Sequence, residues 1–349
     1  MKYDFIVLGA DGNQGSIVVR YLLERGYRVL ATDIFKLRIG SLLQKYKKQA
    51  DFHLVDVTDS DKLIGAIQTS NPDVVINCAE GDWNMNVYRA CISTQRHVVD
   101  LGSRLDMTGD QLKLNREFKK IGCTAITGCG SVPGIGNVML AHAAKKFDSI
   151  ESINVGFAWD SNLKRFVVPF SIESVLEEYT LRSPYIQGGR MRRMRPADSA
   201  IIKNFRVVGS QKIFLVDHPE TYTFFHYFKP MGVQNIRFYA GFPRHSEQVI
   251  SALLDLTFSD TDHVSYQEKN IVPGQFLSQM LKRMKPPRGY KEWENLWVEV
   301  VGRTNRKKKT ILMECIVPPL KGWEEAGCNI DTGFPAAIIA EMIKYGDIS

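Results

Sequence analysis

A histidine and a glutamate flank a proline in the segment DHPET, where His218 and Glu220 stand two residues apart. Histidine is the side chain most easily poised for proton transfer near neutral pH. Pro219 fixes a bend that would hold both neighbours in a defined place. These two residues are therefore candidates for acid–base chemistry. The alternative is a turn with ordinary polar side chains.

Two further carboxylates are candidates for catalysis. Asp100 ends the apolar run HVVD, and ligands of parallel sheets bind at the carboxyl ends of such strands. Asp100 is therefore the best candidate for an active-site carboxylate, although it could instead support the turn in DLGS. Glu173 and Glu177 stand four residues apart and share one face of a predicted helix. We favour Glu173 as functional, while the alternative is a side chain that faces water.

The first glycines of the chain indicate a phosphate-binding turn. Gly9, Gly12 and Gly15 are spaced three residues apart in GADGNQG, between the apolar run FIVL and the helical segment SIVVRYLLER. They permit, in order, a tight turn, close approach of the backbone to a pyrophosphate, and close packing of helix on sheet. The helix N-terminus then favours an anion. The residues expected to hold a dinucleotide here are Gly9, Asp11, Gly12, Asn13, Gln14 and Gly15.

Asp33 bears on the choice of cofactor because it closes the second predicted strand. A carboxylate there accepts both ribose hydroxyls of NAD and repels the 2′-phosphate of NADP, so NAD is expected. Lys36 and Arg38 follow closely and could pair with a phosphate, which leaves NADP possible. Residues after the third and fourth strands are expected to line the adenine and the path to the nicotinamide: Asp56, Val57, Cys78, Ala79 and Glu80. Asp56 could instead cap a helix that starts near Asp59.

Six apolar runs alternate with helix-like segments over the first 147 residues. Continuous Val, Ile and Leu content, without alternation, indicates strands buried on both faces. Segments such as SDKLIGAI and NVYRACIST have apolar residues at helical spacing and are expected to be crossover helices. We therefore predict an α/β fold with a Rossmann-type, doubly wound parallel sheet. The predicted strands are 5–9, 28–33, 52–56, 73–78, 97–102 and 124–129.

Beyond about residue 149 the chain becomes β-rich, and regular crossover helices no longer separate its apolar segments. These segments include SINVGFAW, KNFRVV, QKIFLVDH, TYTFFHYF, NIRFYAGF, LWVEVVG and TILMECIV. The last segment, PAAIIAEMIKYG, has the pattern of a helix that stops at Gly346.

The composition is that of a globular protein with 44% hydrophobic and 24% charged residues in a chain of 349. No apolar stretch reaches the roughly 18 residues that span a bilayer. The first predicted strand begins by Tyr3, so we expect a cytoplasmic protein with no membrane partner. The net charge is +7, but RMRRMR and RKKK come without a nucleic-acid-binding signature and are expected to be solvated loops. The six cysteines form no C-x-x-C pair, so we expect reduced thiols and no metal site.

Seven segments in the same order make the chain resemble the saccharopine dehydrogenase family. In its broad sense this family includes saccharopine reductases, lysine 6-dehydrogenases and carboxynorspermidine dehydrogenases. The segments are VDVTD, DVVINCAE, ACIST with HVVDLG, GCGSVPGIGNVMLAHAA, FSIESVLEEYT, HPETYTF and DTGFPAAIIAEMIKYGDI. Members commonly have an acidic residue where Val132 stands and commonly carry GxGxxG in place of GxxGxxG. These departures leave the particular substrate open.

The resemblance implies two domains. Residues 1–148 and 319–349 would form an NAD(P)-binding Rossmann domain, to which the C-terminal helix returns. Residues 149–318 would form a substrate-binding and dimerisation domain, an α+β domain built on an open mixed sheet. A homodimer follows from the same resemblance.

The resemblance also implies an NAD(P)-dependent oxidoreductase that acts on a C–N bond of an amino acid or amine, such as lysine or saccharopine. That chemistry needs a cation for a carboxylate, an anion for an ammonium and an acid–base group. Arg165, Arg190 and Arg244 are available for the carboxylate, and their spacing does not choose among them.

Three alternatives lead to different functions. One is a carboxynorspermidine-type reductive condensation in polyamine synthesis. A second is a nucleotide-binding sensor protein that lacks catalysis, since a fold alone does not establish function. A short-chain reductase is disfavoured because none of the 13 tyrosines has a lysine four residues later.

Overall fold

The structure is a computed structural model that describes residues 2–168, 171–260, 262–281, 284 and 286–348. The chain divides into two compact units. The first unit joins residues 1–138 to residues 329–349, and the second unit comprises residues 139–328. The first unit is therefore discontinuous in sequence, and the second unit is inserted within it.

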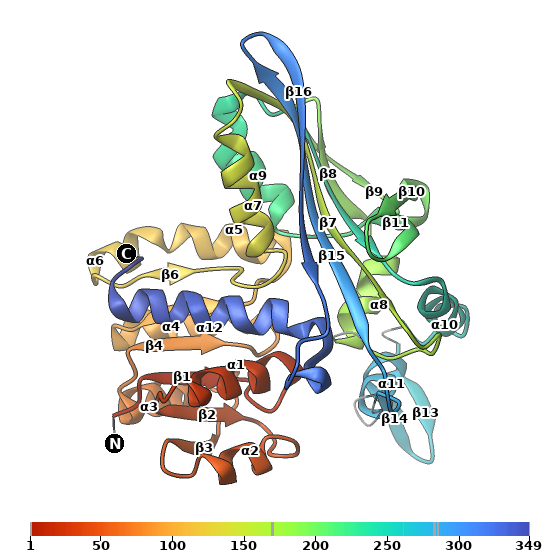
Figure 1. The fold of residues 1–349 in the computed structure, drawn as a ribbon. Helices are drawn as coiled ribbons and strands as arrows, with labels where there is room; N and C mark the ends of the chain where they lie inside the picture. Colours follow the sequence, from red (N-terminus) through yellow and green to blue (C-terminus); the bar gives the residue numbers. More distant parts are fainter. Residues whose placement is uncertain (1, 169–170, 261, 282–283, 285, 349) are drawn as a thin grey trace. The chain divides into compact units, whose positions relative to one another are not determined.

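The first unit is built on a six-stranded sheet in the order β3-β2-β1-β4-β5-β6, and every neighbouring pair of strands is parallel (Figure 1). The Rossmann-type prediction is confirmed. The strands are β1 (Phe5–Leu8), β2 (Val29–Asp33), β3 (Ala50–Leu54), β4 (Val74–Asn77), β5 (His97–Asp100) and β6 (Ala125–Ile126). The helices are α1 (Asn13–Glu24), α2 (Gly40–Lys45), α3 (Ser60–Ser70), α4 (Asn84–Thr94), α5 (Leu105–Lys113), α6 (Asn115–Lys120) and α12 (Ile330–Tyr345), with the 3-10 turn η1 (Gly81–Trp83).

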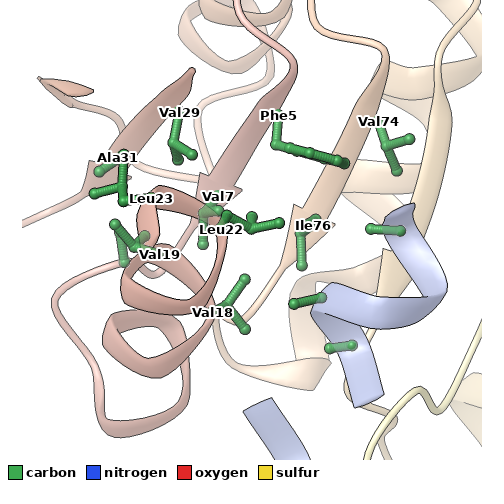
Figure 2. Packing of buried hydrophobic residues seen from close by; sticks show 14 of the residues in the cluster. Phe5, Val7, Val18, Val19, Leu22, Leu23, Val29, Ala31, Val74 and Ile76 are labelled. Atoms are coloured by element: carbon green, nitrogen blue, oxygen red, sulfur yellow. The ribbon is translucent and has the colours of Figure 1, made fainter. Parts of the chain in front are cut away.

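Alternate side chains of the central strand face two separate cores. Phe5 and Val7 of β1 pack with α1 and α12, whereas Ile6 and Leu8 pack with α3 and α4. Figure 2 shows the first of these cores, in which side chains of β1, β2, β4 and α1 meet the returning helix α12. Burying each large apolar side chain contributes about 1.5 to 3 kcal/mol. The sheet is therefore fixed from both faces, which holds the carboxyl ends of its strands in place.

The C-terminal helix α12 packs on the first unit. The PAAIIAEMIKYG pattern predicts the helix, and the family resemblance implies its return to this domain. Its small residues Ala336, Ala337 and Ala340 are fully buried against the core. Gly346 ends the helix with a φ of 77°, a left-handed conformation that suits glycine. Lys344 forms ion pairs with Asp4 and Asp73, which lie at the starts of β1 and β4.

The second unit contains an eight-stranded mixed sheet with the path β10-β11-β12-β7-β15-β16, and β8 pairs with both β12 and β9. The expectation of an open mixed sheet is confirmed, since β12 and β7 are parallel while β7 and β15 are antiparallel. The strands are β7 (Ser149–Ser161), β8 (Ser183–Gln187), β9 (Arg190–Met194), β10 (Ile201–Phe205), β11 (Gly209–Leu215), β12 (Asn235–Gly241), β15 (Glu292–Thr304) and β16 (Lys307–Val317). A separate hairpin joins β13 (Val264–Tyr266) to β14 (Lys269–Ile271).

Most of the helical segments of the second unit lie between strands of this sheet in the sequence, and η4 follows its last strand. They are α8 (Ile172–Thr180), α9 (Glu220–Phe228), α10 (Arg244–Asp255) and α11 (Pro273–Leu281), with the 3-10 turns η2 (Pro196–Ser199), η3 (Lys229–Met231) and η4 (Glu324–Asn329). The helix α7 (Ile135–Ala144) carries the chain across the boundary between the units.

Two expectations for the second unit are wrong. TYTFFHYF is not a strand but most of helix α9, in which Thr221 and Phe224 lie on the buried side. Aromatic content favours strands, but the position after Pro219 suits a first helical turn, and burial of one face decides the outcome. The basic runs RMRRMR and RKKK are not loops either. They lie largely in the strands β9 and β16, where their charged side chains are mostly exposed.

No helix in the described part of the chain combines the length and apolar character that a membrane crossing needs. Among the described residues, no three His, Cys, Asp or Glu side chains form a group that could hold a metal ion. All six cysteines are free thiols, as expected.

Candidate nucleotide and active sites

The glycine turn after β1 is packed so closely that two of its glycines leave no space for a side chain. Gly9 has a φ of +72°, and a Cβ there would lie 2.6 Å from the backbone nitrogen of Ala79. A Cβ on Gly15 would lie 2.1 Å from the carbonyl oxygen of Gly9. Gly12, in contrast, is exposed and would bring its Cβ only to 3.3 Å from the same oxygen. Gly9 and Gly15 therefore shape the turn, and Gly12 leaves bare backbone at its surface.

Gly12 is also the N-cap of α1, and no side chain of the residues that the structure describes caps this helix. Its first backbone N–H groups therefore provide the uncapped, positively polarised helix start that binds phosphate. The close-packed glycines and the uncapped helix fit the pyrophosphate of a dinucleotide. Asn13 and Gln14 occupy the first turn of α1, where the sequence places them.

Asp11 holds the segment that follows β2. Its carboxylate accepts hydrogen bonds from the backbone N–H groups of Leu37, Arg38 and Ile39 at 2.8 to 2.9 Å. The side chain is 8% exposed, so these contacts use most of its accepting capacity. The geometry gives Asp11 a positioning role: it fixes the loop that carries Arg38 beside the glycine turn.

Asp33 lies at the end of β2, but backbone groups occupy its carboxylate. Its Oδ2 accepts a hydrogen bond from the Asp11 N–H at 2.9 Å, and its Oδ1 accepts one from the Ile34 N–H at 2.7 Å. Arg38 meanwhile donates from Nη1 to Oδ1 of Asn13 at 2.6 Å, which brings a guanidinium next to the first turn of α1. A cation and a carboxylate therefore both lie near the glycine turn.

The other residues predicted for the dinucleotide lie at or near the same edge of the sheet. Asp56 accepts a hydrogen bond from the Thr58 N–H at 2.9 Å, and hydrogen bonds from Thr58 lower its pKa. Asp59, rather than Asp56, caps α3. Val57 packs in the core. Cys78, Ala79 and Glu80 follow β4 directly, and burial chiefly raises the pKa of the Cys78 thiol.

Asp100 is fully buried at the end of β5 and accepts hydrogen bonds from several groups. Tyr88 Oη and Gln111 Nε2 each donate to Oδ2 at 2.6 Å. The backbone N–H groups of Gly102 and Gly128 donate to Oδ1 at 2.6 and 3.0 Å. This network uses the lone pairs that a substrate ammonium would need, so the geometry favours a positioning role for Asp100 over direct chemistry.

In the second unit, the residues around Pro219 come together as the sequence suggests. His218 Nδ1 lies 2.8 Å from Glu220 Oε2, and the Glu220 side chain is 0% exposed. The imidazole ring stacks on Phe238 of β12 with ring centroids 3.9 Å apart. Burial alone would lower the pKa of His218, but the charges of Glu220, Glu178 and Asp217 together raise it. His218 is thus held in one orientation and favoured in its protonated form.

Glu178 of α8 is the acidic residue that the sequence reasoning passed over. Its Oε2 is buried and has no hydrogen-bond partner among the described residues. Burial raises the pKa of Glu178 to about 8, against an opposing effect of His218. One sequence signal points to Glu178: it stands three residues after Val175 and so shares a helix face with an apolar residue. In the structure Val175 is buried and Glu177 is exposed. The backbone of Glu173 lies on α8, but its side chain is outside the part that the structure describes.

Comparisons with known proteins agree with this architecture. Residues 5–126 match the family model "Saccharopine dehydrogenase NADP binding domain", and residues 130–349 match "Saccharopine dehydrogenase C-terminal domain". A saccharopine dehydrogenase (L-Glu forming) from Saccharomyces cerevisiae has the same fold, with a TM-score of 0.76 over 99% of this chain and 92% of that one, at 13% identity.

Curated relatives share 25% identity with the chain. They include carboxynorspermidine synthases of Vibrio alginolyticus, over 66% of this chain, and of Vibrio cholerae, over 78% of this chain and 68% of that protein. A carboxyaminopropylagmatine dehydrogenase of Synechocystis matches over 86% of this chain and 77% of that protein. The match spans 58% of the Vibrio alginolyticus protein.

The two family models cover nearly the whole length in the same order as the two halves of the fold. The first half is thus a nicotinamide dinucleotide-binding domain. The chain belongs to the saccharopine dehydrogenase family.

Proposed function

We propose that this chain is an NADP-dependent oxidoreductase that forms or cleaves a C–N bond in a carboxylate-bearing polyamine. The observation that carries the proposal is the ordered match of both family models, together with curated relatives named for carboxynorspermidine and carboxyaminopropylagmatine. In the synthetic direction, an amine and an aldehyde lose water to form an imine. Reduction of the imine by a hydride and a proton then gives a secondary amine.

When bound, NADPH supplies the hydride. The chain's own task is to hold the cofactor and to deliver the proton. The glycine turn and the start of α1 would hold the pyrophosphate, as argued above. Protonated His218, oriented by Glu220 and by stacking on Phe238, is the group that would give its proton to the imine nitrogen.

We propose NADP rather than NAD because the Asp33 carboxylate is engaged by backbone N–H groups while Arg38 lies beside the first turn of α1. An arginine fork suits a 2′-phosphate. Replacing Arg38 by Ala should weaken NADP binding about tenfold or more, which corresponds to about 1.4 kcal/mol or more, and should leave NAD binding unchanged. Calorimetry with both nucleotides measures this.

The matched control is Arg20→Ala, which removes an arginine of α1 that pairs with Glu24 one turn along the same helix. It should bind both nucleotides as the unmodified protein does. An equal loss of NAD and NADP affinity in Arg38→Ala would contradict the choice of NADP.

The reaction is tested by product analysis. The protein is incubated with NADPH, a carboxylate-bearing aminoaldehyde and either 1,3-diaminopropane or agmatine, and the secondary amine is identified by mass spectrometry. Replacing His218 by Gln should reduce turnover at least a hundredfold while NADPH affinity is kept, since general acid catalysis contributes about 10² to 10⁴.

Other results would favour the competing functions. Ammonia release from lysine with NAD or NADP would favour lysine deamination. Tight nucleotide binding without turnover on any amine would favour a sensor. A cytoplasmic homodimer also remains part of the proposal, and sedimentation of the purified protein tests the oligomeric state.

A further inference from the structure

We infer that Glu178 binds the positively charged end of the amine substrate, as an ion pair with an alkylammonium or guanidinium group. This inference rests on the proposed function and adds the group that selects for a cation. It assigns to the second unit an anionic subsite next to the proton donor.

The first argument is that Glu178 has an open position. Among the described residues its buried Oε2 has no hydrogen-bond partner, although the residue as a whole is partly exposed. A buried carboxylate without a hydrogen-bond donor is costly, and such groups in native proteins call for a ligand or a function. The partial exposure of the residue places it near the surface of the second unit.

The second argument is that the neighbouring carboxylate is also incompletely satisfied. Glu220 is 0% exposed, its Oε2 contacts His218, and its Oε1 has no hydrogen-bond partner among the described residues. The charges of His218 and Glu220 balance each other. Once ionised, Glu178 would add a negative charge to this group, and a cationic ligand would balance that charge.

The third argument concerns the elements packed against α8. Helix α11 has no titratable residue, and in η2 the carboxylate of Asp198 pairs with Arg195. On α10, Glu247 pairs with Lys212. Lys212 belongs to β11, and α10 also carries Arg244 and His245. The remaining charged groups that act on Glu178 are His218, which favours its ionised form, and Glu177, which disfavours it.

Pairing with a cation has a measurable consequence. Without a ligand, Glu178 has a pKa of about 8 and carries a proton at pH 7. A cationic ligand stabilises the ionised form, so binding must expel that proton. Affinity for the cation should therefore rise about tenfold per pH unit at pH values below 8 and level off above that value.

Calorimetry of the full-length protein tests this without any turnover. 1,3-Diaminopropane and agmatine are titrated at pH 7 in phosphate and in Tris, whose ionisation enthalpies differ, and 1,3-propanediol serves as the uncharged probe. We expect net release of a proton when either cation binds and no binding of the diol. Binding of agmatine alone would identify a guanidinium site, and binding of the diamine alone an ammonium site.

Single substitutions identify the residue that releases the proton when the cation binds. Glu178→Gln should abolish proton release and weaken cation binding tenfold or more. In contrast, Glu177→Gln should keep both proton release and cation binding, with only a small fall in the pKa of Glu178, because Glu177 is the smallest of the effects on it. Glu178→Asp keeps the charge and should keep proton release with altered affinity, which maintains the test if the Gln variant does not fold. Unchanged proton release in Glu178→Gln would assign the proton to His218 and overturn the inference. Absence of binding by both cations would also overturn it.

The experiments distinguish an error in the inference on Glu178 from an error in the proposed function. If NADPH binds and product forms while Glu178→Gln binds the cations normally, the inference on Glu178 is wrong and the proposed function stands. If neither nucleotide binds and no amine is turned over, the proposed function is wrong, whatever the titrations with diamines show.

Discussion

Single glycines in the turn after β1 serve two purposes, and substitution separates them. In Gly15→Ala the new Cβ would lie 2.1 Å from the Gly9 carbonyl oxygen, so backbone must move. We expect a stability loss of roughly 1 to 3 kcal/mol and a loss of NADP binding. In Gly12→Ala the nearest atom is at 3.3 Å, so stability should change little while NADP affinity falls.

Urea unfolding and nucleotide titration of both variants measure these effects. The two variants serve as controls for each other, because both add a single methyl group to the same turn. Equal destabilisation by both would contradict the assignment of shaping to Gly15 and of ligand approach to Gly12.

The charge of Glu220 sets the pH range in which His218 can donate a proton. Burial lowers the pKa of His218, but Glu220 is the largest of the effects that raise it. Imine reduction should slow as pH rises through this pKa, because the donor loses its proton. Glu220→Gln removes the charge, so the pKa falls and the decline in rate should move to lower pH. The pH dependence of the rate, with Glu177→Gln as control, measures this. An unmoved decline would contradict the pairing.

At the residue scale, the sequence predicts which side chains lie near each other better than it predicts what each of them contacts. The spacing in GADGNQG and the pair around Pro219 were informative because short local geometry fixes them. The roles of Asp11, Asp33 and Asp100 were not readable. Their partners are backbone N–H groups and side chains from other segments, which become neighbours only after folding. Glu178 was missed for the same reason, since its burial depends on what packs on α8.

At the scale of elements, Asp100 links β5 to α4 and α5 through Tyr88 and Gln111. Asp100→Asn replaces one accepting oxygen by an amide NH₂, which then faces a donor. We expect a loss of roughly 2 to 4 kcal/mol in the free energy of unfolding, since a buried charged network loses a partner. Urea unfolding measures the loss. Full stability with lost turnover would instead support the predicted catalytic role of Asp100.

Elements with a strong periodic pattern were predicted well. The six strands and the helices α1, α3, α4 and α12 overlap their expected segments because continuous apolar runs and helical spacing reflect the core directly. The expectation of burial on both faces is wrong for the edge strand β3, which is mostly exposed. Helix α9 was mistaken for a strand because its composition is aromatic. Composition gives only a weak preference, and the tertiary environment overrides it.

At the scale of the whole molecule, the chain leaves the first unit within α7 and returns to it at α12. The returning helix fills the core with Ala336, Ala337 and Ala340, and Arg25 pairs with its Glu341. The nucleotide-binding unit is therefore incomplete until the last residues of the chain are present. Periodicity predicts only the helix, whereas its packing on the first unit is implied by the family resemblance and not by any pattern in the helix itself.

Because the proposed cofactor and amine sites lie in different units, we predict that each ligand slows backbone hydrogen exchange in a different set of segments. NADP should slow exchange roughly tenfold or more in peptides that cover 9–15 and 33–39, because ligand binding stabilises the segments it contacts. 1,3-Diaminopropane should slow exchange in peptides that cover 172–180 and 216–224, where Glu178 and His218 lie. Arg38→Ala should lose only the first effect and Glu178→Gln only the second. Protection of the 9–39 region by the diamine, with none around Glu178, would place the amine site in the first unit and contradict this division of roles.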